Sequence, residues 1–153
     1  VLHLDLAAAG EVGAAIAERP TEEQAALASY GKMLGIAFQL VDDALDYAAD
    51  SAELGKNVGD DLEEGKPTLP LIRAIQTAAP EQASLVRDAI EQGGRDRIDE
   101  IMQIIRETDA IDYSMNLARQ YAEAASRQLE TLPASSYRDA LAELAHFSVN
   151  RDY

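Results

Sequence analysis

The sequence contains no cysteine, which excludes disulfide bonds and thiolate chemistry and fits a cytosolic setting. It also lacks any apolar run close to the roughly 20 residues that a membrane-spanning helix needs. Its first ten residues, VLHLDLAAAG, have no basic segment ahead of their apolar residues, so we expect no signal peptide there. These absences predict a cytoplasmic protein.

Basic residues are also scarce, because 13 Lys and Arg stand against 28 Asp and Glu, for a net charge of −15. A surface this acidic repels phosphate backbones and anionic lipid, so nucleic acid is not an expected partner. Any anionic substrate would need a local reversal of sign, from lysines or from bound cations. Elsewhere the excess of carboxylates could serve solubility alone.

No stretch alternates as a β-strand does, whereas nearly every segment has helical periodicity. The 153 residues therefore predict a single all-α domain spanning 1–153, a helical bundle of about seven helices. The expected helices cover residues up to about 19, 21 to about 50, about 68–77, 80 to 93–94, a short stretch around 98–105, about 109–132, and from 135 or 136 onward. Ser51–Pro67, punctuated by glycines, predicts a long loop of the kind that is often functional.

Three aspartates crowd together in the second of these helices, within GIAFQLVDDALDY. The apolar residues of this helix step by three and four, as in a helix packed in a bundle; they are Leu27, Tyr30, Leu34, Phe38, Val41 and Leu45. Gln39, Asp42, Asp43 and Asp46 share the neighbouring flank by the same spacing. Clustered carboxylates suit Mg²⁺, which takes one or two of them and fills its other positions with water and phosphate oxygens. A plain solvated face is the alternative.

The loop that follows carries two lysines, Lys56 and Lys66, beside this acidic flank. Lysine binds phosphate as a point charge, and glycines let the backbone close over a ligand. Asp60 and Asp61 are either further metal ligands, lysine partners or plain loop charge, of which we favour the last two. A calcium loop is a competing idea, but the alternating acidic pattern and terminal glutamate of such a loop are missing.

The combination FQLVDDALD, LGK and GDDLEEGKPTLP resembles the carboxyl-terminal half of the trans-isoprenyl diphosphate synthases, or polyprenyl synthetases. The likeness is greatest to the bacterial octaprenyl diphosphate synthases and runs from about Pro20 to Tyr153. It implies an all-α isoprenoid synthase-type fold and a transferase of isoprenoid biosynthesis. In that reaction an allylic diphosphate is joined to isopentenyl diphosphate, and Mg²⁺ ions held by two aspartate-rich motifs draw off the allylic diphosphate.

The resemblance implies a role for each matching residue. Asp42, Asp43 and Asp46 correspond to the second aspartate-rich (DDxxD) motif and would bind Mg²⁺, with Asp42 the foremost direct ligand. Lys56 would contact the allylic diphosphate, and Lys66 would help to close the site. Phe38 and Gln39 match a pair near the reacting carbons, where a ring face and an amide oxygen tolerate positive charge.

The chain has no DDxxD motif besides this one and no arginine-rich segment. In the family, the amino-terminal half supplies the first aspartate-rich motif and the basic residues. We therefore expect a carboxyl-terminal fragment that does not complete the condensation alone. Its partners would be a second copy, as in a homodimer, or the missing amino-terminal half. Two rival functions stay open: a non-catalytic acidic partner or regulatory subunit derived from such an enzyme, and a terpene cyclase, against which the GKPTLP loop argues.

Overall fold

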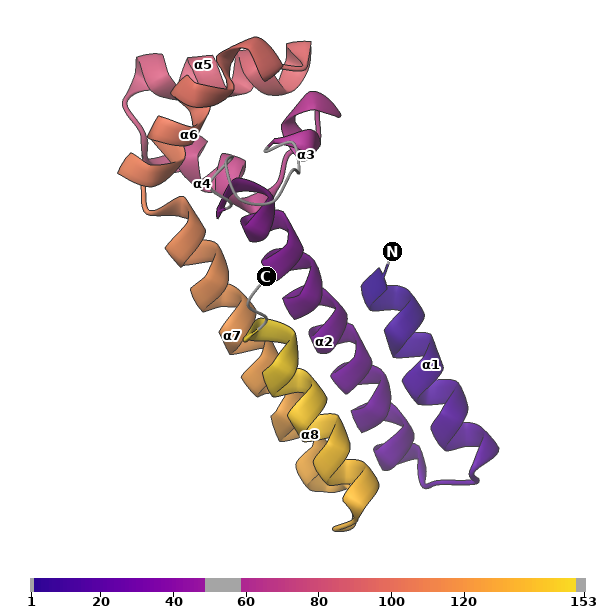
Figure 1. Cartoon of the computed structure of the whole chain (residues 1–153). Coiled ribbons are helices and arrows are strands. Elements are labelled where there is room, and N and C mark those ends of the chain that lie inside the picture. The colour runs from indigo at the N-terminus through magenta and orange to yellow at the C-terminus, as the bar shows by residue number, and fades with distance from the viewer. Residues whose placement is uncertain (1, 49–58, 151–153) are drawn as a thin grey trace. The chain divides into compact units, whose positions relative to one another are not determined.

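The computed structural model describes residues 2–48 and 59–150, and every regular element in this part of the chain is helical (Figure 1). The α-helices are α1 (Leu2–Ile16), α2 (Thr21–Ala48), α3 (Asp60–Glu63), α4 (Leu69–Thr77), α5 (Pro80–Gln92), α6 (Ile98–Glu107), α7 (Ala110–Gln128) and α8 (Ser136–Val149). Short 3₁₀ turns, Arg95–Arg97 and Leu129–Thr131, precede α6 and follow α7. None of the described helices is long and apolar enough to cross a membrane.

The all-α fold class is thus confirmed, and each predicted helix is present. One element was missed, because the predicted loop contains the single turn of α3. The chain divides into two compact units: unit 1 comprises Val1–Val41 and Asn116–Tyr153, and unit 2 comprises Asp42–Met115. The prediction of a single domain over 1–153 stays a prediction.

Unit 1 buries the apolar side of α2 that the helical spacing predicted. Tyr30 and Leu34 are buried together with residues of α7, the following 3₁₀ turn and α8, namely Ala125, Leu129 and Ala145. The Tyr30 hydroxyl donates a 2.8 Å hydrogen bond to the carbonyl oxygen of Leu141, and burial raises the pKa of Tyr30 to about 12. Tyr30 and Leu34 therefore find their packing partners within this chain.

The first two helices approach one another closely at glycines. A Cβ atom on Gly31 would lie 2.2 Å from the carbonyl oxygen of Leu6, and one on Gly35 would lie 2.4 Å from the Cα of His3. Both distances are far below van der Waals contact, so only glycine fits at these two positions. The two helix backbones of unit 1 are therefore in direct contact.

Unit 2 packs short helices around its own apolar core. The fully buried members of this core come from α2 and from α3 to the start of α7; the largest are Tyr47, Leu62, Leu71, Val86, Ile101 and Ile105. Leu62 is the one buried residue of α3 and is completely inaccessible to solvent. This single apolar anchor fixes a helix that is too short to be stable by itself.

Candidate metal and diphosphate site

The three aspartates lie near the carboxyl end of α2, in the part of this helix that belongs to unit 2. They differ in burial, because Asp42 is exposed, Asp46 is half-buried, and Asp43 is only 9% exposed. The flank that the helical spacing predicted thus runs from solvent into the protein. The inner carboxylate, that of Asp43, needs a partner.

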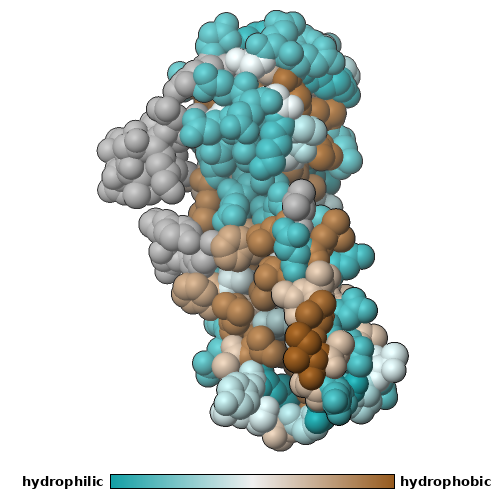
Figure 2. All heavy atoms as spheres, turned by 90° about the vertical axis from the view of Figure 1, so that its right-hand side faces the viewer, coloured by the Kyte–Doolittle hydropathy of each residue, from teal (hydrophilic) through white to brown (hydrophobic). Residues whose placement is uncertain are grey.

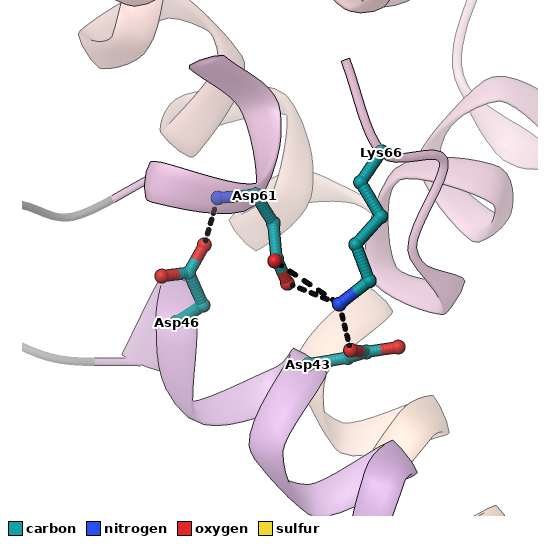
Figure 3. A network of polar contacts seen from close by, with 4 residues as sticks. All are labelled: Asp43, Asp46, Asp61 and Lys66. Carbon is teal, nitrogen blue, oxygen red and sulfur yellow. Dashed lines mark hydrogen bonds and ion pairs between the residues drawn. The ribbon is translucent and has the colours of Figure 1, made fainter. Parts of the chain in front are cut away.

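Lys66 is that partner. Its Nζ donates to Oδ1 of Asp43 at 2.9 Å and to both carboxylate oxygens of Asp61 at 3.0 and 3.1 Å (Figure 3). The lysine reaches these oxygens from the segment after α3, so the ion pair joins the predicted loop to the aspartate motif. Asp61 is thus a lysine partner, one of the two roles that we favoured for it, whereas the pairing of Lys66 with Asp43 was not predicted.

Helix α3 positions Asp61 between Asp46 and Lys66. The backbone N–H of Asp61 donates to Oδ2 of Asp46 at 3.3 Å, while its side chain receives Lys66. Gly59 and Gly65 bracket the helix with φ angles of +85° and +69°, a left-handed conformation that side chains other than glycine adopt at a cost. The glycines of the sequence motif thus bring the chain sharply into α3 and out again toward Lys66.

The electrostatics of the site are dominated by burial. Burial raises the pKa of Asp43, although the hydrogen bond and charge of Lys66 act in the opposite direction. Burial likewise raises the pKa of Asp46, against the hydrogen bond from the backbone of Asp61. For Lys66 burial opposes the charge, yet the two carboxylates outweigh it and raise its pKa. One ammonium group therefore compensates its neighbouring carboxylates only partly.

The remaining predicted site residues are placed as follows. Phe38 and Gln39 are half-buried on α2, in the turn before Asp42. Lys56 lies outside the described residues, so its predicted contact stays a prediction. Tyr47, one residue after Asp46, is buried in the core of unit 2, and burial raises the pKa of its hydroxyl group.

The carboxylates fit a magnesium ion that a substrate also ligates. Within residues 2–48 and 59–150, no group of three His, Cys, Asp or Glu side chains is arranged to enclose a metal. Mg²⁺ does not need such a cage, because it commonly takes one or two carboxylates and completes its octahedron with water and phosphate oxygens. Asp42 on the exposed side of the motif and the half-buried Asp46 offer ligands of this kind.

Comparison with known proteins decides the family. A model described as polyprenyl synthetase matches residues 5–108, which include the aspartate motif, α3 and Lys66. The chain belongs to the polyprenyl synthetase family. An octaprenyl diphosphate synthase from Haemophilus influenzae is 51% identical over 146 residues, covering 95% of this chain and 44% of that protein. The octaprenyl diphosphate synthase of Escherichia coli is 45% identical over the same length.

Solved structures of polyprenyl synthases have the same fold. The polyprenyl synthase from Caulobacter crescentus, in complex with calcium and isoprenyl diphosphate, matches with a TM-score of 0.84 and 42% identity. The match covers 95% of this chain and 45% of that one. The polyprenyl synthetase chain thus spans less than half the length of these relatives, and its predicted resemblance to part of that family is confirmed.

Proposed function

We propose that this chain provides the second aspartate-rich part of a prenyltransferase that joins an allylic diphosphate to isopentenyl diphosphate and makes a long-chain polyprenyl diphosphate. Asp42, Asp43 and Asp46 would hold Mg²⁺, directly or through water, against the allylic diphosphate. The bound ion would neutralise the departing diphosphate. The calcium and isoprenyl diphosphate in the Caulobacter crescentus relative support a divalent cation and a diphosphate at such a site.

Lys66 and Lys56 would add positive charge from the loop, and preorganised charge of this kind stabilises a leaving group more in a protein than in water. Phe38 and Gln39 would lie on the side of the reacting carbons. One observation carries the proposal: the matched segment folds so that Lys66 meets the aspartate motif at 2.9 Å. A cation and an acidic helix face are thereby present at one place in a strongly acidic protein.

Binding of Mg²⁺ together with inorganic diphosphate or a bisphosphonate analogue tests the site. A ligand that binds only the folded state stabilises it by RT ln(1 + [L]/Kd), about 2.7 kcal/mol at a hundred times Kd. We expect the melting temperature of the full chain to rise, and Asp42→Asn to reduce the rise. Asp88→Asn, an exposed carboxylate on α5, is the matched control and should leave it intact. An unchanged melting temperature would count against the proposal.

The chain should not complete the condensation alone, because it spans 44% of its Haemophilus influenzae relative and contains one aspartate-rich motif. The assay is transfer from an allylic diphosphate to labelled isopentenyl diphosphate with Mg²⁺ and this chain only. Robust turnover would show that one motif suffices.

A second candidate is a non-catalytic partner subunit derived from such an enzyme, and the surface of α1 favours it. Leu4, Val12 and Ile16 on this helix are 60%, 54% and 79% exposed, and Figure 2, which looks onto α1, shows hydrophobic residues gathered there. On its own the chain should cover them with a second copy. Light scattering should then show a dimer or larger species that Ile16→Lys weakens. Self-association without any response to Mg²⁺ and diphosphate would favour the subunit over the enzyme.

A further inference from the structure

We propose that Lys66 is a built-in competitor of the divalent cation: it neutralises Asp43 while the site is without metal and leaves this carboxylate when Mg²⁺ and diphosphate bind. The inference rests on the proposed function and adds a regulation of that site. It assigns to Asp61 the role of a positioning residue, which keeps the lysine within reach of the aspartate motif.

The contacts of Lys66 show why its position implies competition. Its Nζ occupies the space in front of Asp43 Oδ1 at 2.9 Å, so a cation that took this oxygen as a ligand would have to share it or displace the ammonium group. Two positive charges a few ångströms apart repel strongly in a partly buried place. Mg²⁺ at Asp43 and Lys66 at Asp43 are therefore alternatives.

Displacement is feasible because the lysine is the more exposed member of the pair. Its side chain is 41% exposed, whereas those of Asp43 and Asp61 are 12% and 20% exposed. A half-exposed lysine ion pair contributes little free energy, so a divalent cation can break it. The aspartates, by contrast, sit on helices that are fixed by the core of unit 2.

Asp61 decides where the displaced ammonium group can go. Both of its carboxylate oxygens accept from Nζ, and its backbone N–H holds Asp46. Lys66 can give up Asp43 and still remain against Asp61, beside the motif rather than in solvent (Figure 3). From there it can donate to a diphosphate oxygen, so that the group that competes with the metal alone assists the metal–diphosphate complex.

This dual role predicts opposite changes for one substitution. Lys66→Met removes the competitor and should tighten binding of Mg²⁺ alone about two- to fivefold, the range expected for a partly exposed ion pair. The same variant should weaken binding of inorganic diphosphate at saturating Mg²⁺ about tenfold, because a charge-assisted hydrogen bond is lost. A merely structural role would weaken both.

The measurement is isothermal titration calorimetry on the full chain, first with magnesium chloride and then with sodium diphosphate. Lys32→Met is the control, because it makes the same charge change at an exposed position of α2, about three turns before Asp43. It should change neither the dissociation constant of Mg²⁺ nor that of diphosphate. Changes of Lys66→Met in one direction, or no change, would overturn the inference and leave the proposed function standing. A wild-type chain that bound neither probe would overturn both.

A second measurement needs no neutral variant, in case Lys66→Met does not fold. In the wild-type chain labelled with ¹⁵N-lysine, the side-chain resonance of Lys66, assigned with Lys66→Arg, should shift on addition of Mg²⁺. The resonance of Lys32 should stay in place. If Mg²⁺ binds and the Lys66 signal does not move, the lysine does not leave Asp43 and the inference is wrong.

Discussion

The two units of the chain differ in what holds them together. In unit 1, helices α1 and α2 touch backbone to backbone at Gly31 and Gly35, so fit depends on the absence of side chains. In unit 2, short helices enclose an apolar core, and a polar network of Asp43, Asp46 and Lys66 lies at its edge. Unit 1 is thus specified by shape, whereas unit 2 keeps incompletely compensated carboxylates.

We expect that difference to distinguish packing residues from those of the proposed site. Two of the three aspartates on the last turns of α2 are partly buried, and burial raises the pKa of both. A cluster that costs stability and is nevertheless present is typical of a binding site, where function and stability trade off. The close glycine contacts of unit 1 carry no such cost and indicate helix packing alone.

The comparison is tested most severely by Leu62→Ala, which removes the apolar anchor of α3. Truncating a fully buried leucine costs about 2–5 kcal/mol of unfolding free energy. Because α3 also positions Asp61, we expect diphosphate binding in the presence of Mg²⁺ to fall as well. Chemical denaturation and calorimetry give the two quantities. Asp88→Ala, at an exposed position of α5 in the same unit, is the control. A stable variant that lost only binding, or a destabilised variant that bound normally, would contradict the expected link between the burial of Leu62 and the position of Asp61.

In unit 1 the corresponding test is Gly31→Ala. Its Cβ would lie 2.2 Å from the carbonyl oxygen of Leu6, so α1 must shift, at a cost of about 1–3 kcal/mol. Gly13→Ala is the matched control, because its Cβ would meet nothing within 4 Å. It should stabilise the chain by about 0.5–1 kcal/mol through helix propensity. Equal effects of the two substitutions on the denaturation midpoint would contradict shape as the determinant of this unit.

The sequence was sufficient for the longer helices but not for α3 or for the ion pair. Glycine and proline marked the ends of α5, and apolar spacing along α2 identified the side buried at Tyr30 and Leu34, because both signals are local. Helix α3 was missed because four residues are too few to show a periodicity. Its stability comes from the packing of Leu62 against core residues that are far away in the sequence. The pairing of Lys66 with Asp43 joins residues that are 23 positions apart, so it depends on the tertiary fold, which no local pattern encodes.

The sequence did contain a signal for the position of α3. Asp60 and Asp61 follow Gly59, and acidic residues favour the first turn of a helix because they complement its dipole. Taken together with a leucine at the next position, this pattern predicts a short capped turn. The functional assignment of Asp42 and Lys56 was available only through the resemblance, since spacing alone left a solvated face equally open.

The smallest expected effect concerns the cost of the aspartate motif, tested by Asp46→Asn. The pKa of Asp46 is raised in the folded state, so this state binds the proton more readily than the unfolded chain. The contribution of the Asp46 carboxyl to the stability of the folded state is complete below the ordinary Asp pKa of about 3.9. It is lost as the pH rises through the raised pKa. At pH 7 without metal, the asparagine should therefore increase stability by about 0.5 kcal/mol, the scale of one or two like-charge pairs on a helix.

The advantage of Asp46→Asn should shrink as the pH falls toward the ordinary Asp value, because the wild-type carboxylate then takes up its proton. Thermal unfolding at several pH values measures this, with Asp88→Asn, exposed on α5, as the control for net charge. Adding Mg²⁺ and diphosphate should reverse the order, since the wild type gains a ligand that the asparagine cannot supply as an anion. A variant less stable than the wild type at pH 7 without metal would mean that Asp46 serves the fold of unit 2, and the contrast between the units would lose its basis.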